Sequence, residues 1–377
     1  EGMGSALQQA FASDPRMKEA FEKSAEEMKG MEGLAVKTVS SFFMVPVGVP
    51  FDRAAALASA DQPLAQGPDL GGAAAAGARD AAAYRALFAV GAIVVELGGG
   101  LALAAVPETH SAASLQAKYA ALGDRLQNNP FQRALTLDSF ESSSNLKGDI
   151  YALVDHPFST VSAALNGAEE WCEVLILHIN TKYCRAATDA SRTALLLSVG
   201  KKTPQPLDEA YPIEFAYRVA AATATYLEIQ LNAEEGPLST RNYRIQLQAV
   251  PAGNGRTFLH LTYSYEFGMA WRLAMKTYLA TIGSGKVGFT QTGKQSNGQP
   301  EHIGGMRGVV ERNTMRYYLA IDAYLGALAS PKPLQFQKRL NSWITATEQY
   351  PRQLREVDRT AYFDMKRSEY LRQQTAP

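Results

Sequence analysis

The sequence predicts an α+β fold in which a curved antiparallel sheet wraps around a long amphipathic helix, with extra C-terminal helices after it. Three observations support this prediction. Segments between residues 211 and 266 alternate apolar and polar side chains at the spacing of strands. Residues 305–328 repeat apolar side chains every three or four positions, as one face of a helix does. A further helical pattern at residues 156–174 precedes the strands.

The alternating segments predict an antiparallel sheet with one apolar and one solvated face. "AGNGR", residues 252–256, supplies a hairpin turn between the last two strands. The apolar face consists of Ile213, Phe215, Tyr217, Val219, Leu227, Ile229, Leu231, Tyr243, Ile245, Leu247, Leu259, Leu261, Tyr263 and Tyr265. The opposite face consists of Glu214, Arg218, Glu228, Gln230, Arg244, Gln246, Gln248, His260 and Glu266.

The apolar face of such a sheet needs a cover, and the long helix supplies it. Its stripe consists of Met306, Val310, Asn313, Tyr317, Ile321, Tyr324 and Leu328. Charged residues such as Arg307, Glu311 and Asp322 lie off that stripe. A strand, a helix, a run of antiparallel strands and a closing amphipathic helix form the order of the helix-grip fold.

This order carries a family resemblance. "LKGDIYALVDHPFSTVSAALNGAEEWCEV", followed by strands and the closing helix, resembles the START-like or polyketide-cyclase (SRPBCC) superfamily over residues 135–329. More narrowly, residues 108–377 resemble secreted bacterial proteins of that type that carry "WCEVLILHINTKYCRA", "YLATIGSGKVGFT" and "GGMRGVVERNTMRYYLAIDAYL". The chain departs from the superfamily pattern at "GMAWRLAMKTYLATIG", at "KVGFTQTG" and in its appended C-terminal segment, so the resemblance does not assign a ligand.

The resemblance implies a cavity between sheet and helix that holds a lipid or another hydrophobic small molecule. The residues agree in kind, because inward tyrosines would give an apolar wall with hydroxyls that orient a ligand. The same stripes would also fit a filled core. The candidate ligand-binding residues are Tyr217, Tyr243, Tyr263, Tyr265, Asn313, Tyr317 and Tyr324.

Few residues are candidates for catalysis. None of the five histidines pairs at metal-ligand spacing, and the sequence indicates neither a metal nor a cofactor. His178 and His260 are expected in the middle of strands, each either a general base or a structural histidine. The alternation places His260 on the outer face of the sheet, which favours a binding protein over an enzyme.

Cys172 and Cys184 are the only cysteines in the chain. One closes a helical segment and the other falls late in the next predicted strand, so the chain can fold back and pair them. In an exported protein we expect a disulfide. In a cytoplasmic one, both would be free thiols.

The chain divides into five segments. Residues 1–60 read as a helix plus strands, the tail of another module unrelated to the rest, and 61–84 as a Pro/Gly/Ala linker. Residues 85–107 form a signal-like or membrane segment. The START-like domain is expected at 108–330 and a helical extension at 331–377. The extension is either a helical pair packed on the domain or a docking arm for a membrane or partner.

The segment at 85–107 decides the expected location. Arginines precede an apolar run, and an A-x-A pattern ends at Ala104, as in a secretory signal peptide. Residues 87–106 are also long enough for a membrane anchor, although a carboxylate and three glycines weaken that interpretation. A buried core helix is the third alternative. The first two predict an exported protein, periplasmic or membrane-associated.

The charge composition disfavours nucleic acid as a partner. Lys plus Arg equals Asp plus Glu at 37 each, so no overall positive field favours nucleic acid. Three functions remain from the sequence. The favoured one is an exported protein that binds a hydrophobic small molecule or lipid. A hydrolase or cyclase using the same cavity, with His178 or His260 as base, is the second. The third is a structural envelope module with a filled core.

Overall fold

The computed structural model describes residues 110–375 except 190, 270, 273–274, 276–278 and 280–284. The segments predicted at 1–60, 61–84 and 85–107, including the signal-like or membrane segment, lie outside the described residues, as does most of "GMAWRLAMKTYLATIG". Within the described part of the chain, no helix combines the length and apolar character that crossing a bilayer requires.

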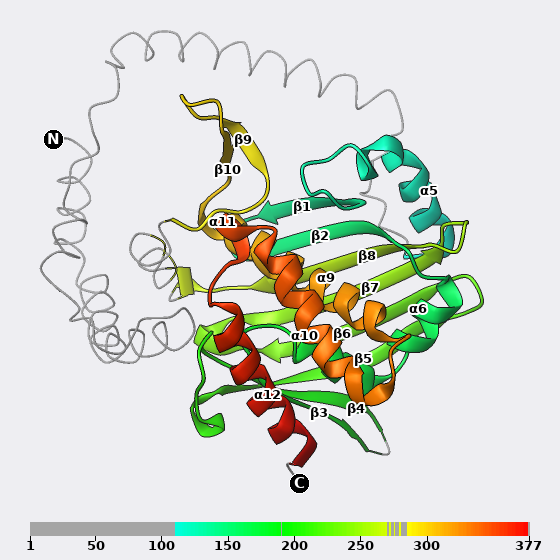
Figure 1. The fold of residues 1–377 in the computed structure, drawn as a ribbon, viewed down its shortest axis with the longest axis vertical. Coiled ribbons are helices and arrows are strands. Elements are labelled where there is room, and N and C mark those ends of the chain that lie inside the picture. The colour runs from blue at the N-terminus through cyan, green and yellow to red at the C-terminus, as the bar shows by residue number, and fades with distance from the viewer. Residues whose placement is uncertain are drawn as a thin grey trace, which may run out of the picture. The chain divides into compact units, whose positions relative to one another are not determined.

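The main sheet has eight strands, is open, and follows the order β1-β2-β8-β7-β6-β5-β4-β3 (Figure 1). Every neighbouring pair is antiparallel. The strands are β1 (Leu135–Glu141), β2 (Asn145–Val154), β3 (Thr181–Thr188), β4 (Thr193–Val199), β5 (Tyr211–Ala222), β6 (Leu227–Glu235), β7 (Arg241–Pro251) and β8 (Thr257–Glu266). A separate hairpin pairs β9 (Gln291–Lys294) with β10 (Pro300–His302).

The helices complete the predicted α+β, helix-grip fold. Helices α6 (Phe158–Leu165) and α7 (Ala168–Leu175) connect β2 to β3, and α9 (Gly305–Ala327) packs across β1, β2 and β8 (Figure 1). The helix expected at 156–174 is two helices, because Gly167 takes an extended conformation between them. The hairpin at 252–256 is present, with Gly253, Asn254 and Gly255 at positive φ.

The extra C-terminal helices are α10 (Lys332–Glu348), α11 (Pro351–Leu354) and α12 (Arg359–Thr375). Helix α10 packs on α9, where the Trp343 indole donates to the carbonyl of Arg316 at 3.2 Å. Helix α12 packs on β3. The C-terminal segment is therefore packed on the domain, the first of the two arrangements expected from the sequence. Its helices bury α9 beyond the single stripe that faces the sheet.

Helix α9 approaches the sheet closely at Gly148 on β2. A side chain there would place its Cβ 2.2 Å from Oγ1 of Thr314 on α9, a distance that real Cβ atoms do not reach. The fully buried Glu311 fixes a neighbouring loop to the same helix by accepting hydrogen bonds from the backbone N–H of Phe289 at 2.6 Å and of Thr290 at 2.9 Å. Helix α9 is thus held by a close contact and by a buried carboxylate.

The outer face of the sheet differs from the prediction. Helix α5 (Ala112–Leu122) contacts β7, and the side chains buried beneath it form a second apolar cluster. The expectation of a solvated outer face is therefore wrong at this end of the sheet, because α5 excludes water there. The cluster consists of Leu115, Leu122, Leu126, Leu153, Tyr226, Val250 and Phe258.

The structure contains the disulfide between Cys172 of α7 and Cys184 of β3, twelve positions apart. Both residues are buried, so the bridge joins the end of α7 to the sheet from within the core. The pairing favoured from the sequence is confirmed.

We expect the double substitution Cys172→Ala and Cys184→Ala to lower the free energy of unfolding by about 3 kcal/mol, because the unfolded chain regains the freedom of the closed loop. Denaturant titration of both proteins, with and without reductant, measures the difference. Reductant should destabilise the wild type by a similar amount and leave the variant unchanged. Equal stability of variant and oxidised wild type would contradict the expectation.

Candidate functional site

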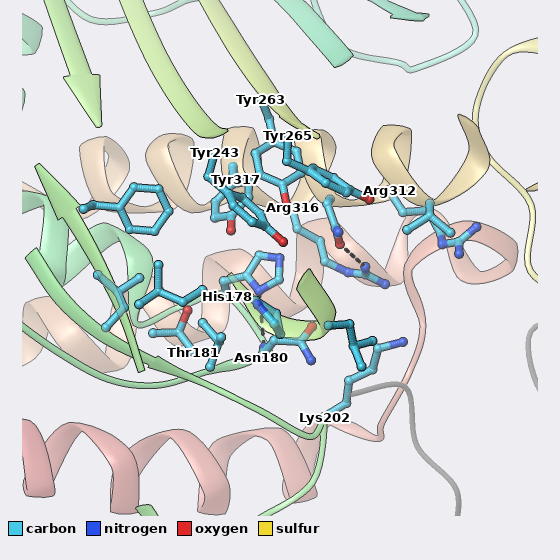
Figure 2. Close-up of a pocket in the computed structure, with 18 of the residues that line it drawn as sticks. His178, Asn180, Thr181, Lys202, Tyr243, Tyr263, Tyr265, Arg312, Arg316 and Tyr317 are labelled. Carbon is cyan, nitrogen blue, oxygen red and sulfur yellow. Dashed lines mark hydrogen bonds between the residues drawn. The ribbon is translucent and has the colours of Figure 1, made fainter. Parts of the chain in front are cut away.

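A cavity of about 100 Å³ lies between the sheet and α9. Its walls come from α9, from strands β3, β4, β5, β7 and β8, and from the turn between α7 and β3. Figure 2 shows four tyrosines on one side, His178 facing them, and cationic side chains toward one end. The cavity therefore has an aromatic side and a polar end.

The aromatic side is a cluster of stacked and tilted rings. The ring centroids of Tyr243 and Tyr265 lie 5.1 Å apart, as do those of Tyr263 and Tyr317. The Tyr243 hydroxyl donates to Oγ1 of Thr240 at 2.8 Å. Burial raises the pKa of the Tyr263 and Tyr265 hydroxyls well above the usual value, so both stay neutral.

Five of the seven predicted ligand-binding residues line the cavity: Tyr243, Tyr263, Tyr265, Asn313 and Tyr317. The other two do not line it. Tyr217 is half-buried on β5, close to a register irregularity between β5 and β6. Tyr324 lies about two helical turns beyond Tyr317 on α9, where its ring contacts the Arg339 guanidinium at 4.7 Å.

His178 is not in a strand, so that expectation is wrong. It lies in the turn between α7 and β3, and its ring stacks on Tyr317 with centroids 4.7 Å apart. The nearly continuous apolar run "LILHIN" resembles a buried strand because the turn is buried on several sides. The turn brings His178 into the cavity wall (Figure 2).

The hydrogen bonds of His178 define its chemistry. The backbone N–H of Asn180 donates to Nδ1 at 3.3 Å, so the proton of the neutral ring is on Nε2. Burial, reinforced by the charges of Arg316, Lys366, Lys202 and Lys182, holds the pKa of His178 well below its usual range. Nε2 has no hydrogen-bond partner among the described residues. The side chain therefore offers the cavity an N–H donor and no basic nitrogen.

Helix α12 holds this turn in place. The Tyr362 hydroxyl donates to the carbonyl of Leu177 at 2.9 Å. The Lys366 ammonium donates to the carbonyls of His178 and Thr181, each at 2.7 Å, and pairs with Glu369 at 2.8 Å. The C-terminal helix thus fixes the backbone on both sides of the His178 side chain.

His260 lies on the opposite face of the sheet, as the alternation predicts. Its Nε2 is 2.9 Å from Oδ1 of Asp149, and its ring stacks on Tyr151 at 4.1 Å. It does not line the cavity and is buried on the outer face. This geometry fits a structural histidine.

Three cations that the sequence analysis did not single out line the polar end: Lys202, Arg312 and Arg316. Among the described residues that line the cavity there is no carboxylate. Lys202 and Arg316 pair with Glu356, at 2.8 and 2.7 Å, just outside the lining. Burial lowers the pKa of Lys202 to about 8 although Glu356 opposes this shift. Arg312 and Arg316 lie one helical turn apart, beside the apolar stripe of α9. This spacing was the sequence feature from which a cationic end of the cavity could have been predicted.

Glu356 balances several of these charges. Burial would raise its pKa, but Lys202, Arg316 and Lys286 outweigh burial and lower the pKa to about 2. The carboxylate therefore stays ionised in the folded protein. The described residues contain no cluster of three or more His, Cys, Asp and Glu side chains that could hold a metal ion.

No protein-family model and no curated protein matches the chain. Among solved structures, the Zhui aromatase/cyclase from Streptomyces sp. R1128 is similar at 11% identity, covering 37% of this chain and 86% of its own, with a TM-score of 0.27. A norcoclaurine synthase point mutant from Thalictrum flavum is 14% identical, covers 38% of this chain and 87% of its own, and has a TM-score of 0.27. Human StAR-related lipid transfer protein 5 is 9% identical, covers 46% of this chain and 95% of its own, and has a TM-score of 0.24. Because these TM-scores are low, the helix-grip assignment rests on the strand order and helix positions of the chain itself.

We expect Glu356→Gln to lower the free energy of unfolding by about 3 kcal/mol at pH 7, because three cations lose their buried partner. The folded-state pKa of about 2 lies below the usual 4.5, so the carboxylate stabilises fully above pH 4.5 and loses its effect as the pH falls toward 2. Denaturant titrations from pH 7 to pH 3 should show the difference from wild type shrinking below pH 4.5.

Glu234→Gln is the matched control, since Glu234 is exposed on β6. It should stay within about 0.5 kcal/mol of wild type throughout. A difference for Glu356→Gln that does not change with pH would contradict the assigned ion pairs.

Proposed function

We propose that this protein is an exported binding protein that holds a hydrophobic small molecule in the cavity between its sheet and α9. The observation that carries the proposal is the Nε2–H of His178, a buried donor without a partner among the described residues that faces an aromatic cavity. Buried polar groups in folded proteins are normally hydrogen-bonded. A bound molecule with an acceptor would satisfy this donor.

The same observation argues against a structural module with a filled core. A filled core would leave no room beside His178 and would have no use for a donor there. Three cationic side chains also line the cavity, and burying them costs free energy that packing alone does not require. A ligand site accounts for both features.

Binding is also favoured over catalysis by a hydrolase or cyclase. The two histidines considered as bases do not fit that role. His178 presents a protonated nitrogen to the cavity, and His260 lies on the far face of the sheet. The buried tyrosines have raised pKa values and remain neutral donors. The cavity therefore offers donors that orient a ligand.

The cavity volume limits the ligand. Pockets for drug-sized molecules enclose roughly 300–1,000 Å³, whereas an engineered apolar cavity of about 150 Å³ binds benzene. At about 100 Å³, this cavity is smaller than that benzene site, so a body of one ring is the upper limit and requires small shifts of the surrounding side chains. A sterol or a two-chain lipid would require α9 and the sheet to separate.

Export is the second part of the proposal. The signal-like segment at 85–107 and the disulfide between Cys172 and Cys184 support it, because structural disulfides persist in oxidising compartments. Fractionation of cells that produce the full chain tests it directly. Recovery of the protein only in the cytoplasm, with both thiols reduced, would contradict it.

Native mass spectrometry of the full chain, purified from an oxidising compartment and followed by organic extraction, tests the binding function. We expect a reproducible small-molecule adduct that extraction removes. Val309→Phe, which adds a ring to the cavity wall, should abolish the adduct or weaken it at least tenfold. Val219→Phe, on the exposed part of β5, is the control and should retain it. An adduct unaffected by Val309→Phe would contradict the assigned cavity.

A further inference from the structure

We propose that the ligand is a carboxylic acid with a small aromatic body, bound as its anion with the carboxylate against His178 and Arg316. This inference rests on the binding function proposed above and names the chemical class of its ligand. Four features of the cavity point to it: two donors, an excess of positive charge, an aromatic wall and a small volume.

The two donors are the strongest feature. Nε2 of His178 and Nε of Arg316 are both without hydrogen-bond partners among the described residues, and both side chains line the cavity. His178 is 4% exposed and Arg316 is 2% exposed, so neither donor is satisfied at an open surface. Arg316 uses its other guanidinium nitrogens, Nη1 with Asn313 at 3.1 Å and Nη2 with Glu356 at 2.7 Å. Two N–H groups remain for a ligand.

The charge at this end of the cavity has a definite sign. Lys202, Arg312 and Arg316 line it, and no carboxylate does so within the part of the chain that the structure describes. Glu356 is a single carboxylate paired with Lys202, Arg316 and Lys286. The positive charge therefore exceeds the negative, and an anionic head group would balance it.

The rest of the cavity selects the body of the ligand. Tyr263, Tyr265 and Trp271 line the aromatic side, where an aromatic ring would stack or meet ring edges. The volume of about 100 Å³ limits the body of the ligand to one ring at most and excludes a long acyl chain. Two N–H donors match the two oxygens of a carboxylate, whereas a phosphate monoester has three terminal oxygens to satisfy.

Affinities measured by ligand-observed NMR on the full chain, with the disulfide intact and after organic extraction, test this inference. The probes are benzoate, its neutral isostere benzamide, phenyl phosphate and toluene. We expect benzoate to bind at least tenfold more tightly than benzamide and more tightly than phenyl phosphate, because only benzoate presents a planar pair of charged oxygens to both donors.

Variants separate recognition of the head group from general packing. His178→Leu should lower the affinity for benzoate about tenfold or more and change the affinity for toluene by less than about threefold. His178→Gln, which restores a donor, should recover most of the affinity for benzoate. Arg316→Lys keeps the charge beside Glu356 and removes Nε, so it should reduce the preference for benzoate over benzamide. His260→Gln, on the opposite face of the sheet, is the matched control and should change neither the affinity for benzoate nor its preference over benzamide.

Each outcome decides between the two proposals. If benzamide or toluene binds as well as benzoate, the cavity binds ligands but the anionic assignment is wrong. If phenyl phosphate binds more tightly than benzoate, the assignment of the head group as a carboxylate is wrong. If no probe binds wild type, and Val309→Phe and wild type behave alike, the binding function itself fails. An equal loss of benzoate and toluene in His178→Leu, without rescue by His178→Gln, would assign His178 a purely structural role and overturn the inference.

Discussion

The burial of helix α9 on more than one side is the constraint on which the rest of the structure depends. Strands β1, β2 and β8 contact the helix, and α7, α10 and α11 contact it as well. Most of its residues are consequently buried, including Glu311, Arg312 and Arg316. Burying charged residues at those positions of a helix costs free energy, which ion pairs and hydrogen bonds reduce. Glu311 receives backbone N–H groups and Arg316 pairs with Glu356.

The cavity follows from this arrangement. The helix that must be buried places tyrosine and arginine side chains toward the same hollow beneath the sheet. The C-terminal helices that complete its burial also hold the His178 turn, through Tyr362 and Lys366 of α12. The disulfide between Cys172 and Cys184 joins the preceding helix to the neighbouring strand. The segment appended to the helix-grip order is therefore part of the scaffold of the cavity.

Periodicity predicted the parts of this fold in which one face of an element is buried. The apolar residues predicted to face inward at 213–215, 227–231 and 259–265 are buried, because alternation reports burial. Periodicity did not show that β8 and α9 are buried on their polar sides as well, where Glu311 is fully buried. The turn of His178 was missed because it is buried on several sides and so resembles a strand. The cover provided by α5 was missed because its few buried residues give little periodic signal.

The polar end of the cavity was the hardest part to predict. Lys202, Arg312 and Arg316 are charged, and charged residues are ordinarily expected at the surface. Lys202 and Arg316 are buried against Glu356, which is 40 or more positions away along the chain, so no local pattern reports their burial. Tyr243, Tyr263 and Tyr265 were easier to predict because their inward position follows from strand alternation. Tyr217 shares that alternation and Tyr324 shares the helical spacing of α9, but neither residue lines the cavity.

The proposed binding function depends on a neutral His178 whose Nε2–H faces the cavity. The most direct measurement is the ¹⁵N and ¹H NMR spectrum of its imidazole ring in labelled protein between pH 5 and 8, with and without benzoate. We expect a neutral ring protonated at Nε2 throughout this range, with an Nε2 resonance that shifts when benzoate binds. An imidazolium, a ring protonated at Nδ1, or an Nε2 resonance indifferent to benzoate would contradict it.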